Sequence, residues 1–106
     1  PDPELEAEFD DPANAIPLAR IECHYFRESC FLQGWSIIKN AGKLAGIPGV
    51  IVHGRYDVVC QPLSAWRLKE AWPNAEIHFT ISGHTAGDPE NTHRLILATE
   101  RFEDIE

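Results

Sequence analysis

Asp57 and His84 are the two residues whose types and positions could support acid–base chemistry. Each follows closely on an apolar, strand-forming run, and 27 residues (84 − 57) separate them. A carboxylate that binds one imidazole nitrogen sets the tautomer of the ring, and the other nitrogen can then take a proton from a nucleophile. The spacing alone leaves an alternative open, because such an aspartate is often a turn former and a Gly-His pair is often an ordinary loop histidine.

Glu22 is a third candidate, because its carboxylate falls in an apolar row of a predicted helix. Pro17 stands where this helix could begin, and Leu18, Glu22 and Phe26 follow at intervals of four residues. Residues at this spacing lie on one face of a helix. A carboxylate among apolar side chains costs free energy unless it has a partner. The position of Glu22 is therefore unusual, and a partner is needed to explain it.

The chain from residue 47 onward predicts a strand, a helix, a strand and a helix. Residues 50–52 (Val-Ile-Val) are a β-branched run that predicts a strand buried on both faces. Pro62 begins the next helix, and residues 76–81 alternate in polarity, as in a half-exposed edge strand. Pro89 begins the last helix, after a capping aspartate.

This order of elements places the two acid–base candidates together. Strands joined by a crossover helix pair in parallel and end at the same edge of the sheet, where α/β proteins place their active groups. We therefore expect Asp57 and His84 in neighbouring loops. A sheet of two parallel strands is not a normal free-standing structure. The sequence thus predicts an α/β fold with an incomplete sheet, part of which lies outside these 106 residues.

Four segments carry a resemblance to a known family. They are LARIECHYF (18–26), VIVHGRYDVVC (50–60), AWPNAEIHF (71–79) and ATERF (98–102). Together they resemble the end of the proline iminopeptidases (prolyl aminopeptidases), serine peptidases of the α/β-hydrolase family. The resemblance implies a carboxyl-terminal fragment of a serine aminopeptidase that releases N-terminal proline from peptides.

The resemblance also implies roles for the three candidates. Asp57 matches the triad acid and His84 the triad base. Glu22 matches a glutamate that binds the free amino group of the substrate's N-terminal proline, so the substrate's cation would be its missing partner. Two departures from the family pattern, Cys23 and Thr85, remove no group with a stated role.

The expected fold is the carboxyl-terminal part of an α/β-hydrolase, with two parallel strands, flanking helices, a helical cap segment and an incomplete sheet. Residues 1–11 are acidic and are expected to form a flexible start. Residues 12–46 are expected to be a helical segment derived from the cap. Residues 47–106 are expected to be the final strand-helix-strand-helix of the core.

The sequence contains no serine in the setting that a nucleophilic serine requires. The motif GxSxG, which places a serine on a tight strand-to-helix turn, does not occur. The pair of flanking glycines is missing at all four serines (Ser29, Ser36, Ser64 and Ser82). Cys60 could be proposed as a thiol nucleophile, but a small buried or half-buried residue after the strand is the favoured interpretation. We therefore predict that the isolated chain is catalytically inactive.

A metal or other cofactor is not expected. His53, His78 and His84 are the histidines that invite a metal site, but no HxH or HExxH motif is present.

The composition narrows the class of partner. A formal net charge of −8 argues against nucleic acid and anionic membranes. No apolar run approaches the roughly 20 residues needed to cross a bilayer. Three cysteines without a CxxC pair signal no disulfide framework and indicate a reducing cytoplasm. The resemblance adds two partners, peptides with an N-terminal proline and the missing amino-terminal part of the hydrolase domain.

Two alternatives stay open. The chain could be part of another α/β-hydrolase, such as an esterase or an epoxide hydrolase, which would share Asp57 and His84 but need no amine-binding Glu22. It could also be a truncated product without catalytic activity.

Overall fold

The computed structural model describes residues 3–103, and Leu5 and Glu8 by their backbone only. The chain divides into two compact units, and the division falls between Trp35 and Ser36. We call residues 3–35 the amino-terminal unit and residues 36–103 the α/β unit. The segment 12–46, which is expected to be derived from the cap, therefore contributes residues to both units. The division of the chain into segments 1–11, 12–46 and 47–106 stays a prediction.

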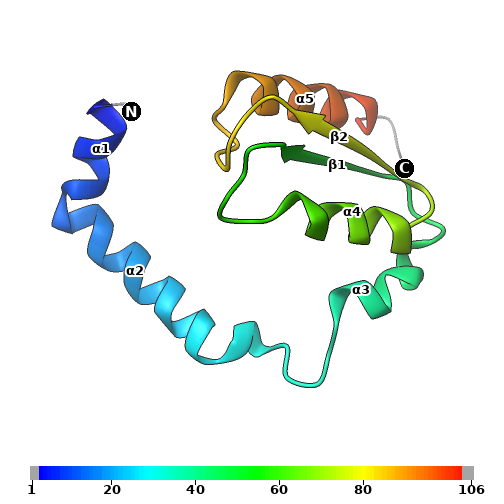
Figure 1. Cartoon of the computed structure of the whole chain (residues 1–106), viewed down its shortest axis with the longest axis horizontal. Helices are drawn as coiled ribbons and strands as arrows, with labels where there is room; N and C mark the ends of the chain where they lie inside the picture. Colours follow the sequence, from blue (N-terminus) through cyan, green and yellow to red (C-terminus); the bar gives the residue numbers. More distant parts are fainter. Residues whose placement is uncertain (1–2, 104–106) are drawn as a thin grey trace. The chain divides into compact units, whose positions relative to one another are not determined.

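The amino-terminal unit is helical (Figure 1). It contains α1 (Pro3–Asp10), α2 (Pro12–Arg27) and the 3-10 turn η1 (Ser29–Phe31). Most of the acidic start lies in α1, and its described side chains are exposed. The expectation that residues 1–11 are flexible stays a prediction. No residue of α2 is buried.

The start of α2 differs from the prediction, which placed it at Pro17. The helix begins at Pro12, because Asp11 caps it: Asp11 Oδ1 accepts a hydrogen bond from the Ala13 N–H at 2.9 Å. Proline is favoured at the first position of a helix, where its missing N–H would have no partner. Pro17 lies inside the helix instead, a position that normally costs a backbone hydrogen bond.

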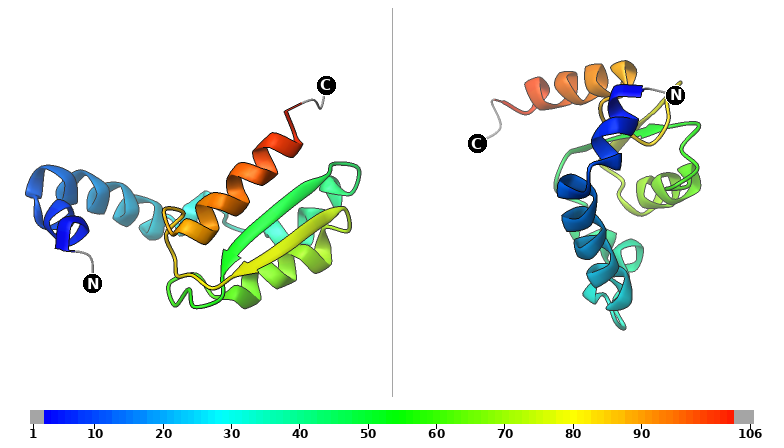
Figure 2. Two further views of the ribbon diagram at one scale, coloured as in Figure 1. Left: turned by 90° about the horizontal axis from the view of Figure 1, so that it is seen from above. Right: turned by 90° about the vertical axis from the view of Figure 1, so that its left-hand side faces the viewer.

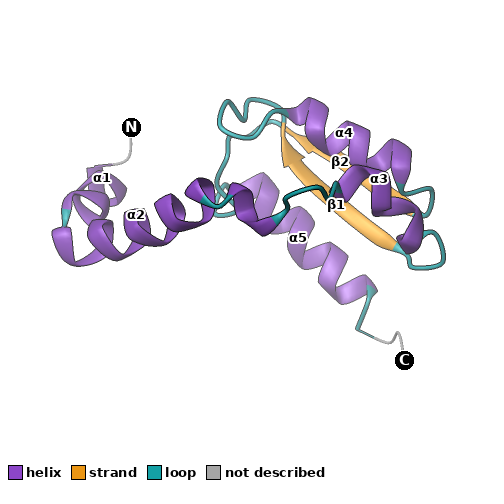
Figure 3. Cartoon of the chain, turned by 90° about the horizontal axis from the view of Figure 1, so that it is seen from below, coloured by secondary structure: helices purple, strands orange, loops and turns teal. Residues whose placement is uncertain are grey.

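The α/β unit is built around two parallel strands, β1 (Gly49–Gly54) and β2 (Ala75–Thr80). Gly49 pairs with Ala75 and the register continues to Gly54 and Thr80. Helix α4 (Pro62–Ala71) connects the strands and α5 (Pro89–Arg101) follows them, and the two helices lie on opposite sides of the sheet (Figures 1 and 2). Helix α3 (Ile37–Asn40) and the 3-10 turn η2 (Ala41–Leu44) precede β1, with α3 beside α4 (Figure 3).

The core of this unit is small. Its buried apolar residues among those described are Ala41, Ala65 and Ala75. Residues 50–52 are half-buried, so the prediction of a strand buried on both faces is wrong for this chain. The reason is the sheet itself, since within the described residues β1 pairs with β2 alone and its other edge is uncovered. The α/β architecture with an incomplete sheet is confirmed.

The end of β2 also departs from the predicted alternation. Ile81 lies beyond the strand and is 75% exposed, whereas Thr80 is buried. Thr80 is a polar residue with partners in α5, and the hydrogen bonds described below explain its burial. None of the helices within residues 3–103 has the length and apolar character needed to span a membrane.

Candidate active site

The structure brings Asp57 and His84 into direct contact. The Nδ1 atom of His84 lies 3.0 Å from Asp57 Oδ2 and 3.2 Å from Oδ1. An ionised carboxylate can only accept, so Nδ1 carries the proton and donates it. Asp57 is 7% exposed, whereas the side chain of His84 is 55% exposed. The buried acid thus holds one side of the ring and leaves Nε2 as the free nitrogen.

The turn after β1 orients the carboxylate of Asp57 through hydrogen bonds that do not involve His84. Oδ1 accepts hydrogen bonds from the N–H groups of Val59 at 3.0 Å and Cys60 at 2.8 Å. An aspartate that accepts from residues two and three positions later is a common device of tight turns. Because these two bonds occupy Oδ1, Oδ2 is the better acceptor for His84, as its shorter distance shows.

The environment lowers the pKa of Asp57. Burial alone would raise that pKa, because it penalises the charged carboxylate. The N–H of Cys60, the ring of His84 and the N–H of Val59 act in the opposite sense, and the charge of His84 adds to them. The net result is a pKa below the ordinary value of 3.8. Asp57 is therefore ionised at neutral pH, and both of its oxygens can only accept hydrogen bonds.

The loop that carries His84 packs closely on the end of β1. The N–H groups of Arg55 and Tyr56 donate to the carbonyl oxygens of Thr80 at 2.9 Å and Ser82 at 3.0 Å. Gly54 permits this approach, since a Cβ there would lie 2.6 Å from the Ser82 carbonyl oxygen and collide with that of Gly83. Figure 1 shows the two loops leaving the sheet at the same end, as expected for parallel strands.

His53 is a neighbour of Asp57 that the sequence did not identify as part of this site. Its Nε2 lies 2.9 Å from the Cys60 carbonyl oxygen and 3.6 Å from Asp57 Oδ2. The turn from 54 to 60 folds back on β1 and creates this contact, so no spacing in the sequence could have signalled it. His78 pairs with Val52, one position before the His53–Phe79 pair, so the side chains of His53 and His78 point to opposite faces of the sheet.

Cys60 is exposed, contrary to the expectation of a buried or half-buried residue. One ligand atom each from Asp57, Cys60 and His84 lie within 4.8 Å of one another, so these are the described residues that could contact a single metal ion. Both oxygens of Asp57 are already within hydrogen-bonding distance of His84, and Oδ1 also accepts from two N–H groups. An ion would therefore compete with the hydrogen bonds that define the site.

Comparison with known proteins decides the family. The chain is 47% identical to the proline iminopeptidase of Xanthomonas citri over 95 residues, which are 88% of this chain and 30% of that protein. It is 44% identical to the proline iminopeptidase of Xylella fastidiosa (strain Temecula1) over 103 residues, 95% of this chain and 33% of that protein. The chain belongs to the proline iminopeptidase family. No family model matches it.

The similarity covers nearly the whole length of this chain but a small part of the length of each relative. The proline iminopeptidase of Arabidopsis thaliana is 39% identical over 88% of the chain, which is 25% of that protein. The chain thus spans a quarter to a third of the length of these curated relatives. The α/β unit agrees with the carboxyl-terminal part of an α/β-hydrolase fold, with two parallel strands and flanking helices.

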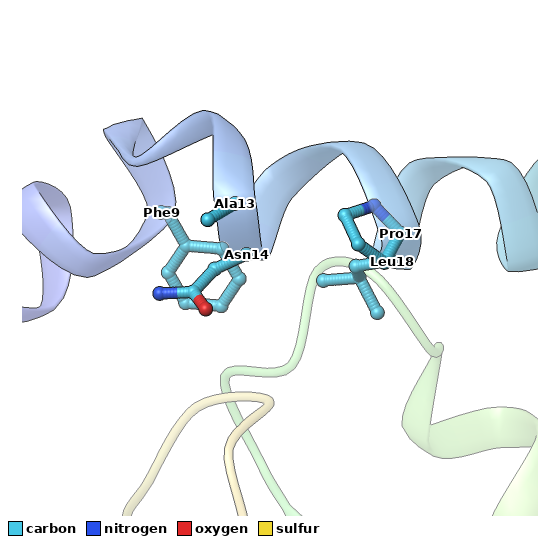
Figure 4. Close-up of a pocket in the computed structure, with 5 residues that line it drawn as sticks. All are labelled: Phe9, Ala13, Asn14, Pro17 and Leu18. Atoms are coloured by element: carbon cyan, nitrogen blue, oxygen red, sulfur yellow. The ribbon is translucent and has the colours of Figure 1, made fainter.

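Glu22, the third predicted site residue, lies in the amino-terminal unit. It is on α2 and its side chain is exposed, so the expected burial against an apolar row is not present among the described residues. The hollow in this unit has a volume of about 310 Å³ and does not include Glu22 (Figure 4). Its lining comes from the end of α1 and the first half of α2: Phe9, Ala13, Asn14, Pro17 and Leu18. The substrate-binding role of Glu22 stays a prediction.

Proposed function

We propose that this chain supplies the acid and the base of a serine aminopeptidase that releases N-terminal proline from peptides. The observation that supports the proposal is the hydrogen bond of 3.0 Å between His84 Nδ1 and Asp57 Oδ2. In this role Asp57 keeps the proton on Nδ1, so Nε2 of His84 can take the proton of an attacking serine. The serine and the donors that stabilise the oxyanion would come from outside these residues.

Glu22 would provide specificity by binding the ammonium group of the N-terminal proline. The resemblance of the segment LARIECHYF to the family suggests this role, and the exposure of Glu22 on α2 is compatible with it. Hydrogen bonds between an ammonium group and a carboxylate are charge-assisted and stronger than neutral ones. The same interaction would distinguish peptides with a free amino terminus from blocked peptides.

The 106-residue chain by itself is expected to be inactive, because it carries no nucleophile in a GxSxG turn. Its main partner would be the rest of the hydrolase domain. We also propose a cytoplasmic location, which the three free and exposed cysteines Cys23, Cys30 and Cys60 support, since disulfides are rare there.

A chimera tests the aminopeptidase function. This chain would replace the matched segment of the Xanthomonas citri relative, and release of proline from a short peptide would be measured. We expect activity in the chimera, a loss of about 10⁴-fold in kcat with Asp57→Asn and a loss of about 10⁶-fold with His84→Ala. The matched control is His78→Ala, a histidine of the same unit outside the pair. An active His84→Ala chimera would contradict the assignment.

Glu22→Gln separates the peptidase from other α/β-hydrolases. In the chimera, we expect this change to lower kcat/KM for a prolyl peptide at least about tenfold, because it removes a charge-assisted interaction. Hydrolysis of a simple ester without an amino group should be unchanged. Glu28→Gln is the control, since it removes only a surface pair with Arg27. Equal activity of Glu22→Gln on the prolyl peptide would favour an esterase-like enzyme.

The intact mass of the native protein in its source tests the remaining alternative, a truncated product. A mass of two to three times 11.9 kDa would support a complete hydrolase domain. A mass equal to that of these 106 residues would favour the short product and contradict the catalytic assignment for this chain.

A further inference from the structure

We propose that Asn91 is a positioning residue that holds the loop of His84 against Asp57. Asn91 lies in the first turn of α5 and is 5% exposed. Its side chain binds the chain on both sides of His84 and so fixes the two ends of the segment that carries the imidazole. The role of His84 as a base rests on the proposed function, but the contacts of Asn91 do not depend on it.

The acceptor atom of Asn91 binds the residues before His84. Asn91 Oδ1 lies 2.5 Å from the hydroxyl of Thr80 and 2.8 Å from that of Ser82, and the two hydroxyls lie 2.5 Å apart. Thr80 and Ser82 are also buried, at 4% and 8% exposed. Water therefore cannot readily replace these bonds when one partner is removed. The group left without a partner then lowers the stability by its full desolvation free energy.

The donor atom of Asn91 binds the residue after His84. Asn91 Nδ2 donates to the carbonyl oxygen of Thr85 at 2.9 Å. A carbonyl can only accept and the two hydroxyls can donate, so these partners fix which way the amide faces. Asparagine offers an acceptor and a donor on one short side chain, which is what both sides of the loop require.

Other groups at the start of α5 support the same loop, each on one side of His84. The Asp88 N–H donates to the Thr85 carbonyl oxygen at 3.2 Å and Thr92 Oγ1 donates to that of Ala86 at 2.8 Å, both after His84. Two side chains bind residues before it. Asp88 Oδ2 accepts from the N–H of Gly83 at 2.8 Å, and Glu90 Oε2 accepts from the N–H of Ile81 at 2.5 Å. Both of these bonds hold residues that precede His84. Among the described side chains, Asn91 is the one on α5 that binds residues on either side of it.

The contacts with β1 cannot replace Asn91. The backbone bonds from Arg55 and Tyr56 reach Thr80 and Ser82. Among the described residues, the hydrogen bond of Asp57 with His84 is the one that this turn makes past Gly83. Asn91, Asp57 and His84 line one hollow of about 100 Å³, so a displaced Asn91 would act directly on the pair. Loss of Asn91 should therefore loosen His84 while the carboxylate of Asp57 keeps its bonds to Val59 and Cys60.

NMR spectroscopy of the full 106-residue chain tests this role without any enzymatic assay. The two measurements are the exchange rate of the His84 Nδ1 proton and the pKa of the Asp57 carboxyl group. For Asn91→Leu we expect proton exchange about tenfold faster or more, because buried hydrogen bonds that close the loop are lost. We also expect the Asp57 pKa to rise towards its ordinary value, since the contribution of His84 weakens.

Asn40→Leu is the matched control. Asn40 lies in the same unit and donates from Nδ2 to the Ser36 carbonyl oxygen at 2.8 Å, away from the histidine loop. It should change neither the exchange rate nor the Asp57 pKa, even where it lowers stability. A folded Asn91→Leu chain with both values unchanged overturns the proposal.

Ser82→Ala keeps the proposal testable if Asn91→Leu does not fold. It removes one hydroxyl from Asn91 Oδ1, and a smaller shift in the same direction supports the role, whereas no shift overturns it. Failure of the aminopeptidase assay would disprove the proposed function but leave these NMR results unaffected.

Discussion

The two units of this chain hold their candidate residues in different ways. In the α/β unit, Asp57 is fixed by two backbone N–H groups and by His84, and the loop of His84 is bound by both β1 and α5. In the amino-terminal unit, Glu22 lies on a helix that buries no residue. The positions of the Asp57 and His84 side chains are therefore set by hydrogen bonds within their own unit. The described contacts of α2 hold the helix backbone but do not orient the side chain of Glu22.

Among the predicted changes, Gly54→Ala should have the largest effect, because it acts on the packing that holds the histidine loop in the α/β unit. The new Cβ would collide with the Gly83 carbonyl oxygen and lie 2.6 Å from that of Ser82, so the histidine loop could not pack on β1. We expect the free energy of unfolding of the α/β unit to fall by about 3 kcal/mol, at the upper end for overpacking. Urea unfolding followed by circular dichroism measures it. Gly42→Ala is the control, because nothing lies within 4 Å of a Cβ there, and an equal loss in both variants would refute the close approach at Gly54.

Acid should weaken the α/β unit through Asp57. Its pKa is lowered in the folded state, so the ionised carboxylate contributes stability that is fully present above the ordinary value of 3.8. This contribution is lost as the pH falls below 3.8 through the lowered folded value.

The measurement is urea unfolding at about pH 6 and about pH 3, where the wild type should lose more stability than Asp57→Asn. The variant is the control, because every other carboxyl group is the same in the two proteins. Equal losses would show that Asp57 is not held as described.

Phe31→Leu should have the smallest effect, in the amino-terminal unit. The Phe31 ring lies 5.5 Å from the centroids of both His24 and Tyr25, edge to face with Tyr25. Such aromatic pairs contribute about 0.5–1.5 kcal/mol beyond buried area, and less when exposed as here. Near-ultraviolet circular dichroism during thermal unfolding should show a small loss of stability. Phe26→Leu, whose ring makes none of the described aromatic contacts, should be neutral; a larger loss there would contradict the role of this cluster.

The errors of the sequence-based predictions have specific physical causes. Pro17 predicts a helix start because proline favours the first turn, but Asp11 and Pro12 provide a better start. Residues 50–52 were expected to be buried because a β-branched run normally has layers on both faces, yet here the sheet has two strands. Thr80 was expected to be exposed by alternation, and its hydrogen bond with Asn91 reverses this.

The sequence by itself determined the order of strands and helices and the edge of the sheet where Asp57 and His84 meet. Periodicity and proline positions carry this information, and parallel strands must end at the same edge. The tertiary structure alone decided which oxygen of Asp57 faces His84, that His53 lies beside it, and that Asn91 holds the loop. These features depend on how turns and loops pack in three dimensions, where residues far apart in the chain become hydrogen-bond partners and no local pattern records the pairing.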